Sequence, residues 1–240
     1  MEGFADAVIN AVKKENVEIV NATENIDFIS GQEGSHSEEE ESHSEEEEEG
    51  HEGESEEEHA EHSEEGLDID PHVWLDPNRS ITLAENIKNA LVKINPENKE
   101  AFENNFKFLK EDLDMLDEEF KDMVANANSD TFLVSHSAYG YWTDAYGLKQ
   151  IGISGLSPTD EPSQGEIIEI ISLVKEQNLA YIYFEPNLTN KVANAVQTET
   201  GSNTLTLNNL ESITAENIKN NEDYFTIMQE NIKSLAQGLQ

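Results

Sequence analysis

The chain has 240 residues, 36% of them hydrophobic, which is enough for one or two folded units with a core. Its formal net charge of −38 at pH 7 repels phosphate backbones and anionic lipids, so we expect no nucleic-acid partner and consider cations first. The absence of cysteine excludes disulfides, iron–sulfur clusters and thiol catalysis.

The N-terminal residues predict an amphipathic helix with Phe4, Val8 and Val12 on one side, followed by a strand-like run from Val17 to Val20. No basic start with an apolar stretch and a cleavage site precedes them, so we expect no signal peptide in this chain. No run is long and apolar enough to predict a membrane span. Because the helix begins so abruptly, we expect that the beginning of a longer protein is missing.

The segment 31–66 is acidic and low in complexity. Residues 32–66 contain eighteen glutamates and no lysine or arginine, so much of the charge is local. With almost no apolar side chains to bury, the segment predicts a disordered loop. Five imidazoles lie among its carboxylates and are suited to weak, exchangeable capture of zinc, although they could simply decorate a solvated spacer. They are His36, His43, His51, His59 and His62.

Two helices are predicted after the acidic loop. The first covers 76–93, with apolar residues on one side, and the second begins at Pro96 and continues to about Val124. The apolar residues of the second helix recur every three or four positions, which predicts a long, straight helix.

The remainder alternates between short apolar runs and helical patterns, which is typical of an α/β unit with a mostly parallel sheet. The predicted strands are 131–135, 149–153, 180–184 and 204–207. The predicted helices are 139–146, 164–177, 190–198 and a last one from about 224.

Polar side chains follow the predicted strands, where ligands bind in sheets of this kind. His136 follows the strand TFLVS, Glu185 follows AYIYF, and Glu211 comes shortly after TLTL. His72 lies in an apolar frame, DPHVWLDP. Two histidines and a carboxylate that converge on a cleft would suit a divalent metal such as zinc or manganese.

Less specific readings of these residues stay open. A histidine after a strand is often an ordinary hydrogen-bonded residue, and Glu185 could belong either to a cleft network or to a turn at the strand end. The run NNLES around Glu211 could equally be a turn and helix cap, with Asn209 or Ser212 as the capping residue.

Several ordered motifs resemble those of the solute-binding proteins of zinc and manganese ABC transporters, especially the zinc-uptake lipoprotein branch. They are DPHVWLDP, SHSAYGYW with the following ISGLSP, IYFEPN, LNNLESIT and NEDYFTIMQENIKSL. The acidic, histidine-bearing loop before DPHVWLDP is also similar to that branch. The resemblance extends over essentially the whole chain.

The resemblance implies an α/β, two-lobed metal-binding fold with a long linking helix and one metal ion between the lobes. It implies a partial N-terminal α/β lobe over 1–95, a linking helix over 96–127 and a C-terminal α/β lobe over 128–240. The family's signal sequence, first strand and an upstream ligand histidine have no counterpart here. We therefore expect an incomplete N-terminal lobe and an N-terminally truncated chain.

Matched motif by motif, the resemblance implies that His72, His136 and Glu211 are metal ligands, with Glu185 in a secondary, supporting position. It implies high-affinity binding of zinc, with manganese as the alternative, and delivery to the membrane permease of an ABC transporter. The protein would be an extracytoplasmic, periplasmic or surface-anchored monomer and not an enzyme. We expect the loop histidines to gather zinc for the central site, and acid to release it as the pH falls through about 6.5.

Two other functions are compatible with the residues. Three protein ligands and an open position are the pattern of a zinc hydrolase with Glu185 as base, but the sequence has no HExxH signature. An acidic metal buffer or an adhesin-type surface protein without a transport role is the other alternative.

Overall fold

The computed structural model describes residues 5–13, 17–31, 69–157, 159–186 and 190–240. The predicted N-terminal helix is present as α1 (Ala5–Val12). The strand predicted from Val17 to Val20 is wrong: residues 17–20 belong to no helix or strand. A strand requires a neighbour to accept and donate its backbone hydrogen bonds, and none of the described residues provides one there.

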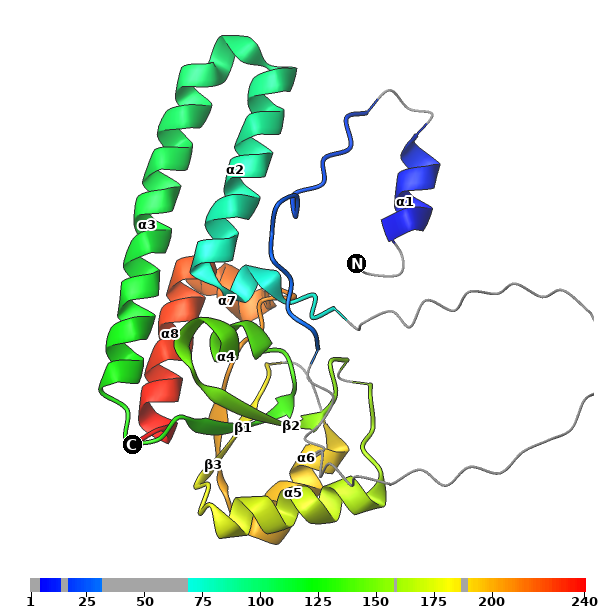
Figure 1. Ribbon diagram of the computed structural model, residues 1–240, viewed down its shortest axis with the longest axis vertical. Coiled ribbons are helices and arrows are strands. Elements are labelled where there is room, and N and C mark those ends of the chain that lie inside the picture. Colours follow the sequence, from blue (N-terminus) through cyan, green and yellow to red (C-terminus); the bar gives the residue numbers. More distant parts are fainter. Residues whose placement is uncertain (1–4, 14–16, 32–68, 158, 187–189) are drawn as a thin grey trace, which may run out of the picture.

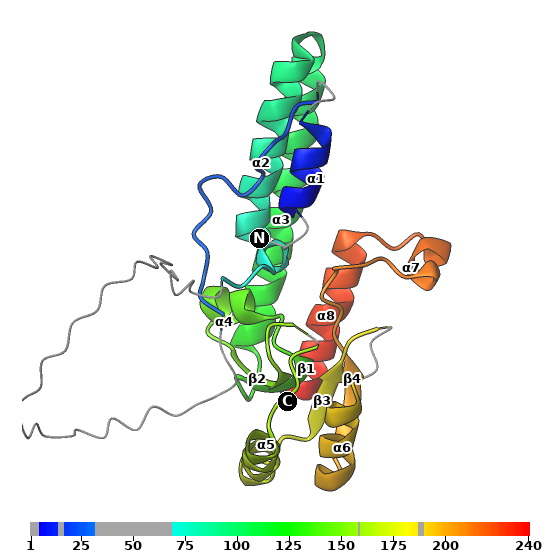
Figure 2. The same ribbon diagram turned by 90° about the vertical axis from the view of Figure 1, so that its right-hand side faces the viewer.

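Two long helices form an antiparallel hairpin that projects from the rest of the molecule (Figures 1 and 2). Helix α2 (Pro77–Ile94) begins where Asp76 accepts a hydrogen bond from the backbone of Asn78 and where proline occupies the first turn. It ends before Pro96, which opens a short 3-10 turn, η2 (Pro96–Asn98). Helix α3 (Lys99–Ala125) then returns to the base of the molecule, as its apolar spacing predicts.

All strands of the four-stranded sheet are parallel, in the order β2-β1-β3-β4. The predicted strands are all present, with ends shifted by one residue or so. They are β1 (Thr131–His136), β2 (Lys149–Ser154), β3 (Tyr181–Phe184) and β4 (Asn203–Thr206). In the register of the sheet, Leu133 of β1 lies beside Ile151 of β2 and Ile182 of β3.

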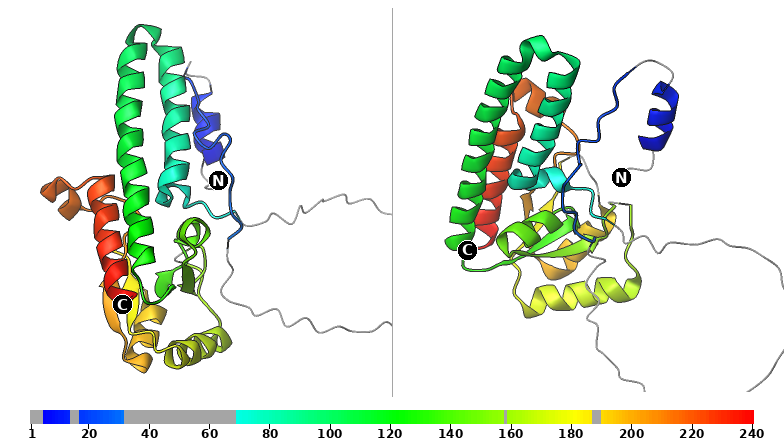
Figure 3. Two further views of the ribbon diagram at one scale, coloured as in Figure 1. Left: turned by 60° about the vertical axis from the view of Figure 1, so that its left-hand side comes forward. Right: turned by 45° about the horizontal axis from the view of Figure 1, so that its top comes forward.

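Helices cover both faces of the sheet, as Figure 3 shows. Successive side chains of β1 point to opposite faces of the sheet. Leu133 packs with α5 (Gln164–Glu176) and α6 (Lys191–Thr200) on one face. Phe132 and Val134 point to the other face. That side is covered by α3, α4 (Gly140–Tyr146) and α8 (Tyr224–Gly238).

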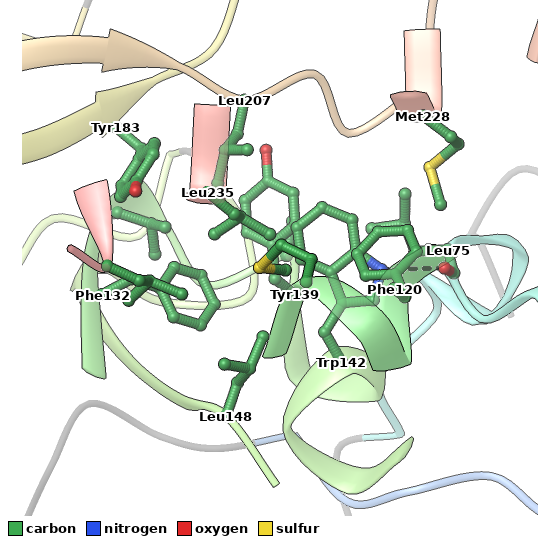
Figure 4. Close-up of a cluster of buried hydrophobic side chains, with 14 of the residues drawn as sticks. Leu75, Phe120, Phe132, Tyr139, Trp142, Leu148, Tyr183, Leu207, Met228 and Leu235 are labelled. Carbon is green, nitrogen blue, oxygen red and sulfur yellow. Dashed lines mark hydrogen bonds between the residues drawn. The ribbon is translucent and has the colours of Figure 1, made fainter. Parts of the chain in front are cut away.

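The larger core cluster lies between α3, α4, α8 and the sheet (Figure 4). The ring of Phe120 stacks on Tyr146, with centroids 5.0 Å apart, and contacts Trp142. The indole nitrogen of Trp142 donates to the backbone oxygen of Leu75 at 2.8 Å. The core therefore reaches the short 3-10 turn η1 (Val73–Leu75) that follows DPH in the sequence.

Two short elements were not predicted, η1 and α7 (Ala215–Asn220), because each is too short for apolar residues to recur over several helical turns. No helix in the described part of the chain has both the length and the apolar character needed to cross a bilayer.

Candidate metal site

His72 lies immediately before η1, and its side chain is buried. One carboxylate oxygen of Asp70, Oδ1, accepts a hydrogen bond from the backbone N–H of His72 at 2.9 Å and lies 2.7 Å from its Nδ1. A carboxylate at Nδ1 fixes the orientation of the ring and leaves Nε2 for another partner. Nε2 lies 3.1 Å from Oε1 of Glu211.

Asp70 is itself held in place by its neighbours. Its backbone oxygen accepts a hydrogen bond from the hydroxyl of Tyr141 at 2.8 Å. A Cβ at Gly140 would lie 2.5 Å from Oδ2 of Asp70, so only glycine allows the start of α4 to approach so closely. Sequence reasoning missed Asp70, although an acidic residue two positions before a candidate ligand histidine was a usable signal.

The prediction placed His136 just after a strand, whereas the structure makes it the last residue of β1. Like His72, His136 is buried. Its Nδ1 lies 2.9 Å from Oε1 of Glu185, and its Nε2 lies 2.7 Å from the backbone oxygen of Leu156. Burial lowers the pKa of His136, but the hydrogen bond and charge of Glu185 and the Leu156 carbonyl outweigh it, so the pKa is raised above its ordinary value.

Glu185 follows β3 and is buried, and its contact with His136 favours the cleft-network reading. Its other oxygen, Oε2, makes no hydrogen bond of standard geometry among the described residues, and the buried hydroxyl of Tyr139 interacts with the same carboxylate.

Glu211 lies in the loop after β4, and 40% of its side chain is exposed. Its backbone N–H donates to the side chain of Asn209 at 3.2 Å. The alternative reading, in which Asn209 or Ser212 caps the next helix, does not hold, because Thr214 caps α7. The capping position lies further along because the loop first makes the turns that present Glu211.

The structure brings together the three predicted ligands. His72 contacts Glu211 directly, and the rings of His72 and His136 meet edge to face with centroids 5.2 Å apart. Glu185 reaches the group through His136. The loop histidines lie outside the described residues; they are His36, His43, His51, His59 and His62.

One pair of atoms in this arrangement has the spacing of two zinc ligands. Two donor atoms of a tetrahedral zinc site lie about 3.3 Å apart, close to the 3.1 Å between Nε2 of His72 and Oε1 of Glu211. His136 presents Nε2 to the Leu156 carbonyl instead. Accordingly, the described residues contain no ready-made cluster of three or more acidic or histidine ligands. His136 must exchange its contact with Leu156 before it can act as the third ligand.

Known proteins of similar sequence include zinc-binding and zinc-uptake proteins. Residues 1–238 match the family described as ZnuA, zinc-uptake complex component A periplasmic. The zinc-binding lipoprotein AdcA of Streptococcus pneumoniae is 37% identical over 240 residues, which cover 99% of this chain and 44% of AdcA. The high-affinity zinc uptake system protein ZnuA of Bacillus subtilis is 37% identical over 171 residues, 71% of this chain and 54% of that protein. The chain thus spans about half the length of these relatives.

Solved structures agree with the sequence relatives. The Zn(II)-bound ZnuA-like domain of S. pneumoniae AdcA superimposes with a TM-score of 0.72 at 33% identity, covering all of this chain and 76% of that domain. A mutant of the laminin-binding adhesin Lmb of Streptococcus agalactiae gives a TM-score of 0.78 at 28% identity, covering all of this chain and 77% of Lmb. The chain belongs to the ZnuA family of zinc-uptake solute-binding components, which is a family of transport proteins and not of enzymes.

Proposed function

We propose that the chain binds a divalent cation, zinc in the first place, as the substrate of an ABC uptake system. The observation that carries this proposal is the meeting of His72, His136 and Glu211 from three separate parts of the chain, with one nitrogen–oxygen pair at zinc-ligand spacing. Membership of the ZnuA family, and the zinc-binding relatives within it, support zinc as the substrate.

Each residue has a distinct role in this proposal. His72 and Glu211 are ligands, and His136 becomes one when its Nε2 leaves the Leu156 carbonyl. Asp70 orients His72, and Glu185 orients His136, because a carboxylate at Nδ1 fixes the ring and raises the basicity of Nε2.

The remaining expectations are part of the same proposal. Two imidazoles favour zinc over manganese, which prefers oxygen ligands. We infer an extracytoplasmic location and a membrane permease as partner, with the chain acting as a monomer. We also infer that 1–95 and 128–240 form the two lobes on either side of a linking helix at 96–127, and that the acidic loop supplies zinc to the site.

The test is a calorimetric zinc titration of the whole chain, of a variant that lacks residues 35–65, and of the double variant His72→Ala/His136→Ala. We expect one tight site that survives removal of the loop and disappears in the double variant. The deletion is the matched control, because it removes five histidines without touching the described site. Weak sites that vanish with the loop would instead identify an acidic metal buffer.

An adhesin role is a second candidate, favoured by the likeness to the laminin-binding structures. The laminin-binding protein Lbp of Streptococcus pyogenes has a TM-score of 0.75 at 28% identity, over 100% of this chain and 78% of Lbp. Binding of the zinc-loaded chain to immobilised laminin, with and without residues 35–65, tests this role. Binding no stronger than that of an unrelated acidic protein rules it out.

A further inference from the structure

The loop that carries Glu211 is held from behind by one side chain, Asn231 of α8. Asn231 is only 2% exposed. Its Oδ1 accepts a hydrogen bond from the backbone N–H of Asn208, and its Nδ2 donates to the backbone oxygen of the same residue, both at 2.8 Å. A single amide therefore satisfies both backbone groups of Asn208.

A short series of hydrogen bonds leads from this clamp to Glu211. The side-chain oxygen of Asn208 accepts from the backbone of Leu210 at 2.8 Å, and that of Asn209 accepts from Glu211 at 3.2 Å. Between them, Leu210 has a φ of 60°. A leucine in this left-handed conformation costs free energy and persists only where its surroundings hold it.

The outer side of the loop borders a pocket. An open pocket of about 370 Å³ lies beside Asn208 and Asn231. On the inner side, the indole N–H of Trp74 donates to the backbone oxygen of Asn209 at 2.8 Å. Side chains of α8 and η1 thus hold the backbone of the loop at two points, through Asn231 and Trp74, while Leu210 packs against the core cluster.

The clamp requires an asparagine. Aspartate has the same shape but only accepts hydrogen bonds when ionised, so one of its oxygens would face the carbonyl of Asn208. Leucine would leave both backbone groups of Asn208 without partners in a buried position. The precise fit of donor and acceptor indicates that Asn231 sets the position of the loop as well as filling space.

We propose that Asn231 is a positioning residue for metal binding, which acts by holding the Glu211 loop so that Oε1 lies beside Nε2 of His72. This inference rests on the proposed function. Because the Glu211 side chain is partly exposed and makes its contact only with His72 among the described hydrogen bonds, its backbone anchor determines where the carboxylate lies.

The experiment compares zinc affinity in the whole chain and in Asn231→Asp. Loss of a group that supports a ligand typically weakens metal affinity roughly 10–100-fold, and we expect a decrease of about tenfold here. The matched control is Gln197→Glu, which removes a comparable amide contact of 2.8 Å, to the backbone oxygen of Ser202 on another part of the α/β unit. The control should bind zinc as the unmodified chain does.

A double-mutant cycle separates positioning from general damage. If Asn231 acts through Glu211, Asn231→Asp has no further effect on zinc affinity in a Glu211→Gln background. The absorption spectrum of bound Co²⁺ provides a second readout: it should change in Asn231→Asp and in Glu211→Gln, but not in Gln197→Glu. Should Asn231→Asp fail to fold, Asn208→Ala, which frees the N–H of Leu210, takes its place in the cycle.

The outcomes distinguish a failure of the positioning role of Asn231 from a failure of the proposed function. Unchanged zinc affinity and an unchanged Co²⁺ spectrum in Asn231→Asp, while His72→Ala abolishes tight binding, overturn the positioning role alone. So does a loss that persists at full size in the Glu211→Gln background. A chain whose tightest site survives His72→Ala overturns the proposed function and this inference together.

Discussion

Residues 5–31 and the α/β unit built from residues 128–240 are held in place by different forces. The α/β unit contains two buried hydrophobic clusters that sandwich the sheet. In contrast, none of the described side chains in 5–31 is classed as buried, and Val17 and Ile19 are 51% and 46% exposed.

Polar contacts attach the N-terminal segment to α2. The side-chain amide of Asn86 donates to the backbone oxygens of Ala22 and Glu24 at 2.9 and 2.8 Å, and the guanidinium of Arg79 donates to that of Asp27 at 3.0 Å. Water competes with contacts of this kind, whereas burial of apolar surface provides most of the free energy of folding. Mutations in the two regions should therefore have effects of very different size.

The largest expected effect comes from truncating the main core. Phe120 is fully buried and contacts both Trp142 and Tyr146. Phe120→Ala removes these contacts and leaves a cavity, which should lower the free energy of unfolding by about 3–5 kcal/mol. Urea denaturation followed by circular dichroism measures this change.

The counterpart in the N-terminal segment is Val17→Ala. Because Val17 is half exposed, we expect the free energy of unfolding to stay within about 0.5 kcal/mol of the unmodified chain. Equal losses in the two variants would show that Val17 contributes as much to stability as a core residue and that the contrast between the two regions is wrong.

A smaller effect is expected from the buried pair of His136 and Glu185. Because the folded-state pKa of His136 is raised above 6.5, the stability that this pair contributes is fully present below pH 6.5 and is lost as the pH rises through the folded-state pKa. Glu185→Gln should remove this dependence, with a cost at pH 6 of about 1.5–3 kcal/mol, typical of a hydrogen bond to a charged group.

Urea midpoints of the metal-free chain between pH 5.5 and 8.5 test this prediction. The unmodified chain should become less stable toward higher pH, and Glu185→Gln should give a flatter profile. Parallel profiles for the two proteins would argue that Glu185 does not control the protonation of His136.

The cap of α8 should contribute less. Asp223 accepts a hydrogen bond from the backbone of Thr226 at 2.9 Å, and this bond, followed by that of the Thr226 hydroxyl, lowers the pKa of Asp223. The contribution is therefore present above pH 3.8 and is lost as the pH falls through the lowered pKa. Asp223→Ala should cost about 1 kcal/mol at pH 7 and progressively less in acid. Asp112→Ala, on the exposed face of α3, is the control.

The smallest global effect is expected from Asn86→Ala, which removes two hydrogen bonds to the N-terminal segment. Global stability should change by less than about 0.5 kcal/mol, while amide hydrogen exchange of residues 17–31 accelerates. If amide hydrogen exchange of residues 17–31 does not accelerate, contacts other than those of Asn86 hold the segment.

The same contrast explains what the sequence could predict. Apart from the short helix α7, the α-helices and strands from residue 77 onward follow from apolar periodicity, since there the pattern and the core agree. The run from Val17 to Val20 has the composition of a strand, but a strand also depends on a neighbour that local pattern does not reveal. The ligand candidates were found from motifs, whereas the supporting roles of Asp70 and Asn231 depend on contacts between distant elements.

The contact between His72 and Glu211 joins residues 139 positions apart. A cation bound by both would act as a reversible cross-link that closes this long loop, and the entropic penalty of such a closure has already been met by folding. The unfolded chain would have to meet that penalty itself, so the cation would bind the folded chain far more tightly. Each tenfold increase of free cation above its Kd would then stabilise the fold by about 1.4 kcal/mol, so thermal unfolding would directly report occupancy of the site.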